Sequence, residues 1–157
     1  MGKCDQQRSL LRLSRFRPLM TTASLRVCRV AVVDDDYDTA TATAAVLYRS
    51  GLRAAVFSTV VSLLEACNDE EFDAFVLDWQ LEDCTSLGLV RTLRARDQSA
   101  RAPIFLLSGS LAVEGLPCDL VMAQAIKSYD LRYRLKPYSP LRLAQELLAT
   151  TFHQRAA

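Results

Sequence analysis

The sequence contains no hydrophobic run close to the roughly 18 residues that a membrane-spanning helix requires. Half of its 157 residues are hydrophobic and 24% are charged, which is the balance of an ordinary globular domain. A chain of this length builds a single hydrophobic core. We therefore expect one soluble domain in the cytoplasm, with no membrane partner.

Paired cysteines are also lacking. The sequence has five cysteines, and none of them forms a CxxC pair: Cys4, Cys28, Cys67, Cys84 and Cys118. Neither a disulfide framework nor a zinc site is indicated by this spacing. We expect reduced thiols, as in a reducing compartment.

A strong net charge is absent, but the charge that is present is unevenly distributed. The formal net charge is +1, with seven basic residues and one acidic residue in residues 1–29 (+6), and 12 basic and 17 acidic residues in the remainder (−5). An acidic body argues against nucleic-acid binding by the fold. Residues 1–28 are a basic leader with four interpretations: a disordered tail, an arm for an anionic partner, sequence upstream of a true start at Met20, or an organelle transit peptide.

Five short apolar runs alternate with segments of helical periodicity from Arg29 onward. The runs cover residues 30–33, 54–57, 74–77, 104–107 and, more weakly, 133–135. Continuous apolar character is typical of strands that are buried on both faces of a parallel sheet. The alternation of strands and helices predicts an α/β fold with right-handed crossovers.

Helix boundaries are marked by capping residues. A helix is expected to start near Asp119, after a long loop, and Ser139-Pro140 supplies an N-cap and a first position for the last helix. We place one domain at residues 29–152 and a tail at residues 153–157. The single histidine, His153, is expected to be a solvated residue of this tail.

Polar residues follow four of the five predicted strands. They are Asp34-Asp35-Asp36, Asp78, Ser108 and Lys136-Pro137. Because the carboxyl ends of parallel strands meet at one edge of a sheet, these groups are expected to form one site. Neighbouring carboxylates repel one another, so the cluster needs open solvent, protonation or a bound cation. The alternative for the first cluster is a solvated turn that caps a helix.

Four motifs in order resemble the receiver domain of two-component response regulators, of the single-domain, chemotaxis type. They are VVDD (32–35), VLDWQ (76–80), LLSGS (106–110) and LKPY (135–138). Each motif alone is weak, but four at suitable spacing are specific, and the resemblance covers about residues 29–152. It implies a flavodoxin-like (βα)5 three-layer sandwich with a five-stranded parallel sheet of order 2-1-3-4-5.

The resemblance also implies a role for each site residue. Asp78 would be the phosphoacceptor, because a carboxylate can form an acyl phosphate by nucleophilic attack. Mg²⁺, with Mn²⁺ as an alternative, would be held by four protein groups: Asp34, Asp35, Asp78 and the main-chain carbonyl of Gln80. The phosphoryl group would be bound by Ser108, Gly109 and Lys136. Ser108 and Tyr133 would form the switch pair, and Pro137 would follow a cis peptide bond.

The function implied by the resemblance is that of a stand-alone receiver, because the chain ends directly after the last helix. It would take a phosphoryl group from a histidine kinase or a histidine phosphotransfer protein. Its fourth helix, fifth strand and last helix would bind an unknown downstream protein, or a second copy as a homodimer. Such a protein is a signalling module, and it catalyses only its own phosphorylation and dephosphorylation.

Two other functions remain open. One is an interaction module that works without phosphorylation, since the segment after Asp78 lacks the Pro and Gly of the common receiver pattern DxxMPxMDG. Glu82 and Asp83 also add negative charge there, and Trp79 is expected to be a lid over the first helix or a partner contact. The other is a small haloacid-dehalogenase-like phosphatase, which would require DxDx[TV]. The chain has Asp at the fifth position of DDDYD and Ala at the fifth position of DYDTA.

Overall fold

The computed structural model describes residues 27–156, except residues 83, 110–111 and 114–115. Side chains are described for the same residues apart from 112, 113, 116 and 153–156. The predicted leader, except its last two residues, and the added charge of Asp83 therefore lie outside the described part of the chain. In that part, no helix combines the length and the apolar character needed to cross a membrane.

Five parallel strands form the central sheet, in the order β2-β1-β3-β6-β9. Their bounds are β1 (Arg29–Val33), β2 (Arg53–Phe57), β3 (Ala74–Asp78), β6 (Ile104–Ser108) and β9 (Leu131–Leu135). Counted along the main sheet alone, this order is 2-1-3-4-5, so the predicted flavodoxin-like topology is confirmed. The central strand is β3, and it ends at Asp78.

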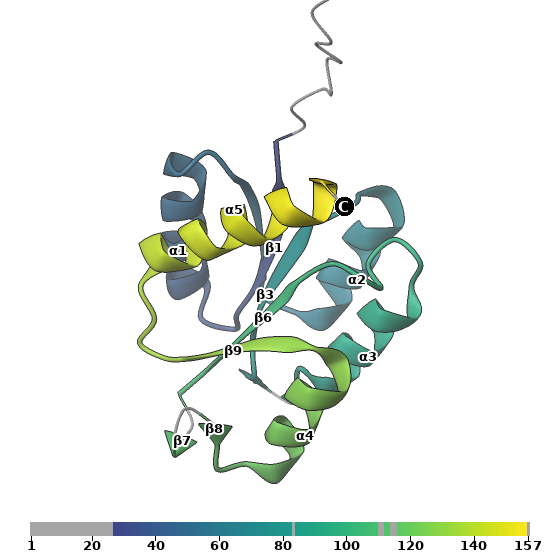
Figure 1. Cartoon of the computed structure of the whole chain (residues 1–157), viewed down its shortest axis with the longest axis vertical. Coiled ribbons are helices and arrows are strands. Elements are labelled where there is room, and N and C mark those ends of the chain that lie inside the picture. Colours follow the sequence, from purple (N-terminus) through teal and green to yellow (C-terminus); the bar gives the residue numbers. More distant parts are fainter. Residues whose placement is uncertain (1–26, 83, 110–111, 114–115, 157) are drawn as a thin grey trace, which may run out of the picture.

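Helices cover both faces of the sheet and complete three layers (Figure 1). One face carries α1 (Tyr37–Arg49) and α5 (Pro140–Ala156), and the other carries α2 (Val60–Asp69), α3 (Leu87–Ala95) and α4 (Leu120–Tyr129). Asp119 caps α4 by accepting hydrogen bonds from two main-chain amides, as its position predicts. The helix α5 runs to Ala156, so the predicted boundary after residue 152 falls inside it.

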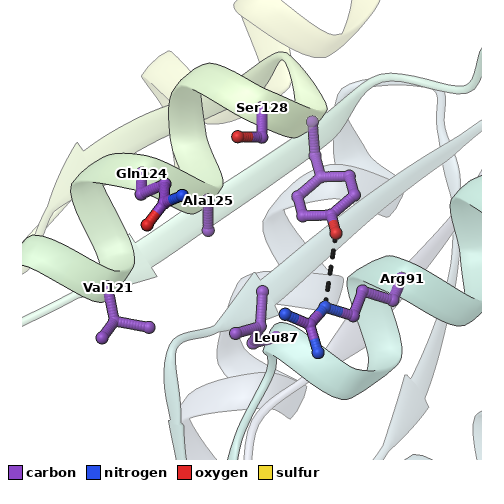
Figure 2. A pocket seen from close by; sticks show the side chains of 7 residues that line it. Leu87, Arg91, Val121, Gln124, Ala125 and Ser128 are labelled. Carbon is purple, nitrogen blue, oxygen red and sulfur yellow. Dashed lines mark hydrogen bonds between the residues drawn. The ribbon is translucent and has the colours of Figure 1, made fainter.

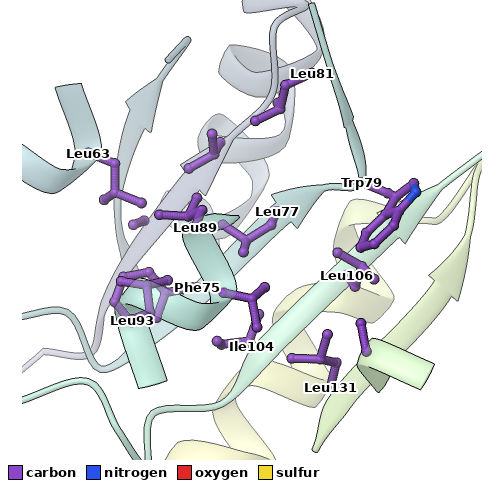
Figure 3. Packing of buried hydrophobic residues seen from close by; sticks show 14 of the residues in the cluster. Leu63, Phe75, Leu77, Trp79, Leu81, Leu89, Leu93, Ile104, Leu106 and Leu131 are labelled. Atoms are coloured by element: carbon purple, nitrogen blue, oxygen red, sulfur yellow. The ribbon is translucent and has the colours of Figure 1, made fainter. Parts of the chain in front are cut away.

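Alternate residues of the strands pack into two separate hydrophobic cores, one on each face of the sheet, because successive side chains of a strand point to opposite faces. Ala31 and Val33 pack under α2, α3 and α4, whereas Val30 and Val32 pack under α1 and α5. Trp79 is 2% exposed and belongs to the first of these cores, beside Leu106 (Figure 3). The prediction that Trp79 is a lid over the first helix or a partner contact was therefore wrong.

Two short antiparallel hairpins, which the sequence did not predict, lie in the connections at the carboxyl edge of the sheet. The first joins β4 (Gln80–Leu81) to β5 (Cys84–Thr85), between β3 and α3. The second joins β7 (Ala112–Val113) to β8 (Leu116–Pro117), between β6 and α4 (Figure 1). The described residues on either side of residue 83 therefore pair as two short strands, although the segment lacks the Pro and Gly of the receiver pattern.

The edge strand β9 starts at Leu131, two residues earlier than the apolar pattern predicts. Arg132 and Arg134 interrupt the apolar run, and their guanidinium carbons lie 5.7 and 5.9 Å from the ring centroid of Phe105. Arg134 also pairs with Glu146 of α5 through an ion pair of 2.5 Å. The two guanidinium groups thus lie over the Phe105 ring, and that of Arg134 also pairs with Glu146.

Replacement of Phe105 tests this packing directly. Phe105 is fully buried, so Phe105→Ala is expected to lower the free energy of unfolding by about 3–5 kcal/mol, because it leaves a cavity under α1 and α5. The matched control is Phe152→Ala on α5, where the ring is 59% exposed and the expected change is within about 0.5 kcal/mol. Equal losses in urea denaturation would contradict the assignment of Phe105 to the core.

Candidate functional site

The ends of four strands bring the predicted site residues to one edge of the sheet. Asp78 is the last residue of β3 and Ser108 the last residue of β6, while Asp34 and Lys136 directly follow β1 and β9. The main-chain amide of Lys136 donates a hydrogen bond to the carbonyl of Ser108 at 2.8 Å. The hydrogen-bonding ladder therefore fixes the backbone of Lys136 beside Ser108.

Three carboxylates meet at this edge. Asp34, Asp35 and Asp78 each offer an oxygen, and these oxygens all lie within 4.8 Å of one another. Asp34 is buried, Asp78 is partly buried and Asp35 is exposed. An all-oxygen donor set that opens to solvent on one side fits Mg²⁺, which binds one or two carboxylates and keeps several waters.

Lys136 reaches two of the three carboxylates. Its Nζ atom lies 2.8 Å from Oδ2 of Asp34 and 3.0 Å from Oδ2 of Asp78. One ammonium against three ionised carboxylates leaves a net charge of −2 at the edge. A divalent cation would offset that charge, which is the second reason why the residues fit such an ion.

The pKa values reflect this crowding. Burial raises the pKa of Asp78 above its usual range, and the charge of Asp34 adds to the rise, although the Lys136 ammonium opposes it. Burial alone would lower the pKa of Lys136. Hydrogen bonds to Asp34 and Asp78, together with their charges, outweigh burial, so the pKa of Lys136 is raised. The raised pKa of Lys136 keeps the lysine charged, whereas burial disfavours the charged form of the Asp78 carboxyl group.

The raised pKa of Asp78 predicts a pH dependence of stability. The folded protein holds a proton on Asp78 more tightly than the unfolded chain does, so the free energy of unfolding falls as pH rises from the ordinary carboxyl pKa through the raised one. Asp78→Asn removes this fall. In EDTA we expect the variant to be more stable than the wild type at neutral pH, with a difference that shrinks below about pH 4. Urea denaturation across this range measures it, and a difference that does not change with pH would contradict it.

The β4–β5 hairpin sets the direction of the Gln80 main chain. Hydrogen-bonded and non-bonded pairs alternate along an antiparallel ladder. The amide of Ser86 donates to the carbonyl of Trp79 at 2.9 Å, so the next pair, Gln80 with Thr85, is a non-bonded one. The main-chain groups of Gln80 therefore point away from β5. The main-chain amide of Gln80 interacts with the Asp78 carboxylate and opposes the rise in its pKa.

Asp36 has a structural role that is separate from the three carboxylates of Asp34, Asp35 and Asp78, which are called the acidic group below. Its side chain accepts hydrogen bonds from the amides of Asp38 and Thr39, both at 3.1 Å, and so caps α1. Hydrogen bonds from Thr39 lower the pKa of Asp36. The capping interpretation therefore holds for the exposed Asp36. Asp34 and Asp35 belong instead to the acidic group with Asp78.

The remaining predicted residues surround this edge. Ser108 is 2% exposed, and a Cβ atom at Gly109 would meet no atom within 4 Å among the described residues beyond its chain neighbours, so space is open beside Gly109. The peptide bond between Lys136 and Pro137, the candidate for a cis bond, is cis. Tyr133 packs against the first core, and its hydroxyl is buried without a hydrogen-bond partner among the described residues.

A separate cleft of about 120 Å³ lies between α3 and α4 (Figure 2). The Nε atom of Arg91 donates to the hydroxyl of Tyr129 across it at 3.3 Å. Its volume is well below the roughly 300–1,000 Å³ of ordinary ligand pockets. None of the acidic group or Lys136 lines it, so the candidate site is the edge of the sheet and not this cleft.

Ser86 is a residue of this edge that the motifs did not single out. It is fully buried at the base of the β4–β5 hairpin, and its hydroxyl donates to the main-chain carbonyl of Asp78. In the receiver pattern this position, eight residues after the acceptor, holds Gly. The only available signal was that departure from Gly, and it did not indicate which contact a serine would make.

The family model of the response regulator receiver domain matches residues 30–145. The match spans most of the chain, and the protein therefore belongs to the response regulator receiver family, a family of signalling modules. This finding removes the support for the phosphatase alternative. No curated protein matches the sequence at a significant level.

Solved receiver structures share the fold at low sequence identity. A CheY-like receiver domain protein from Methanospirillum hungatei is 19% identical, with a TM-score of 0.69 over 83% of this chain and 98% of that one. The chemotaxis response regulator CheY4 of Vibrio cholerae is 18% identical, with a TM-score of 0.66 over 80% of this chain and 98% of that one. The receiver domain of a sensor histidine kinase from Pseudomonas aeruginosa, solved with magnesium in its active-site cleft, is 20% identical, with a TM-score of 0.66 over 80% and 98%.

Proposed function

We propose that this receiver domain accepts a phosphoryl group on Asp78, in a reaction that depends on Mg²⁺, as part of a cytoplasmic two-component pathway. The donor is a phosphohistidine on a histidine kinase or a histidine phosphotransfer protein. The observation that carries the proposal is the group of three carboxylates within 4.8 Å, bridged in part by the ammonium of Lys136. An acceptor without a cation partner would repel the phosphoryl oxygens.

The cation site is formed by Asp34, Asp35, Asp78 and the main-chain carbonyl of Gln80. The directions of the Gln80 main chain support this assignment, and so does the magnesium ion in the related receiver domain from Pseudomonas aeruginosa. Mn²⁺ is the alternative ion. When bound, the cation supplies positive charge that offsets the carboxylates and the incoming phosphoryl oxygens.

The chain's own side chains then position the reacting groups. A carboxylate oxygen of Asp78 attacks phosphorus, the bond between phosphorus and the histidine nitrogen breaks, and the nitrogen keeps the electron pair. Lys136 pairs with a phosphoryl oxygen, and Ser108 donates a hydrogen bond to another. The open space beside Gly109 leaves room for the group. Positioning and charge stabilisation are most of what phosphoryl transfer requires.

The output is a change in the face formed by α4, β9 and α5. Ser108 moves toward the phosphoryl group, and Tyr133, whose hydroxyl is already buried without a described partner, responds to that movement. Exposed apolar side chains of these three elements suit a downstream protein or a second copy of the chain: Leu120, Leu135 and Leu141. A partner that bound both phosphorylation states equally would rule out the switch.

The test is the intact mass of the protein after incubation with acetyl phosphate. With Mg²⁺ present we expect an adduct of one phosphoryl group, and with EDTA we expect none. Because acetyl phosphate is itself a phosphoryl donor, the assay requires no knowledge of the kinase. A folded protein that binds Mg²⁺ and still gives no adduct would contradict the proposal.

The second candidate function is an interaction module that works without phosphorylation. The observation that favours it is the β4–β5 hairpin, which occupies the segment where the receiver pattern has Pro and Gly. The absence of an adduct in the mass experiment would support this function, and an adduct that depends on Mg²⁺ would exclude it.

A further inference from the structure

One residue, Ser86, makes the hydrogen bonds at the base of the hairpin between Asp78 and α3. Its hydroxyl donates to the main-chain carbonyl of Asp78, and its amide donates to the main-chain carbonyl of Trp79 at 2.9 Å. Ser86 is 0% exposed, so both hydrogen bonds are shielded from water. A single buried residue therefore holds two consecutive carbonyls at the end of the central strand.

The two hydrogen bonds close the hairpin at its base. The ladder continues from this base to the pair of Gln80 with Thr85 and then to the pair of Leu81 with Cys84. Leu81 is buried in the first core, which anchors the other end of β4. Gln80, the other residue of β4, is thus held between Ser86 on one side and the core on the other.

The Ser86 hydroxyl restrains a segment that lacks the proline of the receiver pattern. The receiver pattern has Pro at the fourth position after the acceptor and Gly at the eighth, and here these positions are occupied by Glu82 and Ser86, respectively. Proline restricts the backbone dihedral angle φ, and a loop without it is freer to move. A side-chain hydrogen bond from the eighth position to the acceptor's own carbonyl supplies a restraint that Gly cannot make.

We propose that Ser86 is a positioning residue of the acceptor site. Through the carbonyls of Asp78 and Trp79 it fixes the backbone that orients the Asp78 carboxylate and the Gln80 carbonyl. Ser86 touches neither the cation nor the phosphoryl group, so it acts only through these two residues. The inference rests on the proposed function of Asp78.

The test compares two serines with the same local chemistry. Ser86→Ala and Ser86→Gly remove the hydroxyl beside the acceptor, and Ser99→Ala removes a buried hydroxyl that donates to the carbonyl of Leu93 at 2.6 Å, at the end of α3. Both sites lose one hydrogen bond to a main-chain carbonyl. Similar losses of thermal stability are therefore expected, and they serve as the structural baseline.

The readouts are cation affinity and phosphorylation rate. Trp79 is the only tryptophan and lies next to Asp78, so its fluorescence follows a titration with Mg²⁺, and electron paramagnetic resonance follows Mn²⁺. We expect Ser86→Ala and Ser86→Gly to weaken cation binding by about tenfold, which is typical when a group that orients a metal ligand is removed. We also expect both variants to be labelled more slowly by acetyl phosphate at saturating Mg²⁺. Ser99→Ala is expected to match the wild type in both.

Two outcomes would overturn the inference. One is unchanged cation affinity and labelling rate in both Ser86 variants, and the other is an equal loss in Ser99→Ala, which would indicate general destabilisation. Failure of the proposed function is distinguishable, because then the wild type itself would acquire no phosphoryl group. A wild type that is labelled together with Ser86 variants that are labelled equally well would refute the role of Ser86 alone.

Discussion

Asp78→Asn is expected to abolish phosphoryl labelling by acetyl phosphate completely. Asparagine keeps the size of the side chain but has no carboxylate oxygen to attack phosphorus. Asp78 ends the central strand, and its carboxylate, like that of Asp34, contacts Lys136 and belongs to the acidic group. Intact mass under saturating Mg²⁺ gives the extent of labelling directly.

The control for this loss is Asp97→Asn. Asp97 is an exposed carboxylate in the turn after α3, outside the acidic group. Its removal changes the net charge by the same amount, and labelling is expected to equal that of the wild type. Residual labelling of Asp78→Asn at the wild-type level would show that another residue accepts the group.

Lys136→Met is expected to destabilise the protein by about 1–3 kcal/mol at neutral pH in the absence of divalent cations. The substitution keeps an apolar stem of similar length and leaves three carboxylates without the ammonium that pairs with two of them. Breaking a fully buried pair costs about 3–5 kcal/mol, and the partial exposure of Lys136 reduces that figure. Urea denaturation in EDTA measures the loss.

Magnesium distinguishes this effect from simple loss of packing. Mg²⁺ at about 100 times its Kd adds roughly 2.7 kcal/mol to any protein that binds it only when folded. We expect Lys136→Met to recover at least as much as the wild type does, because the cation no longer competes with the ammonium. Lys127→Met, at an exposed lysine in the last turn of α4, is expected to be neutral. A variant of Lys136 that Mg²⁺ does not stabilise would contradict a cation site at this edge.

The main sheet could be predicted because its strands are long enough to have a pattern. Five apolar runs gave β1, β2, β3, β6 and β9 to within two residues, and the polar residues after them marked the carboxyl edge. The largest difference is at β9, which carries Arg132 and Arg134; its start was missed because their packing on Phe105 is a tertiary contact. A hydrophobic pattern cannot indicate a charged group that lies over a buried aromatic ring.

The two hairpins could not be predicted from periodicity. Each strand in them has only two residues, and two residues show no period. The β4–β5 hairpin also lacks the Asn-Gly and Asp-Gly turns by which short hairpins are recognised. The end of α5 was placed too early for a related reason: no Gly or Pro follows Phe152 to end the helix, and Phe152, the last residue of the apolar helical stripe, was taken as its limit.

At the site, residue types could be predicted from the sequence, but their supporting contacts could not. Asp34, Asp78 and Lys136 were expected to meet, and they do, with both ion pairs at 3.0 Å or less. Ser86 was missed, because a hydroxyl that donates to a main-chain carbonyl leaves no motif. Trp79 was misplaced, since a residue beside a polar site can still turn its side chain into the core.

The most direct measurement is the position of the phosphoryl group on the labelled wild-type protein. Reduction of the acyl phosphate with borohydride marks the modified carboxyl group, and peptide mass spectrometry then locates it. The account predicts one mark, on Asp78, which appears only when Mg²⁺ is present during labelling. A mark on Asp34, Asp35 or Asp36, or one that forms equally in EDTA, would contradict it.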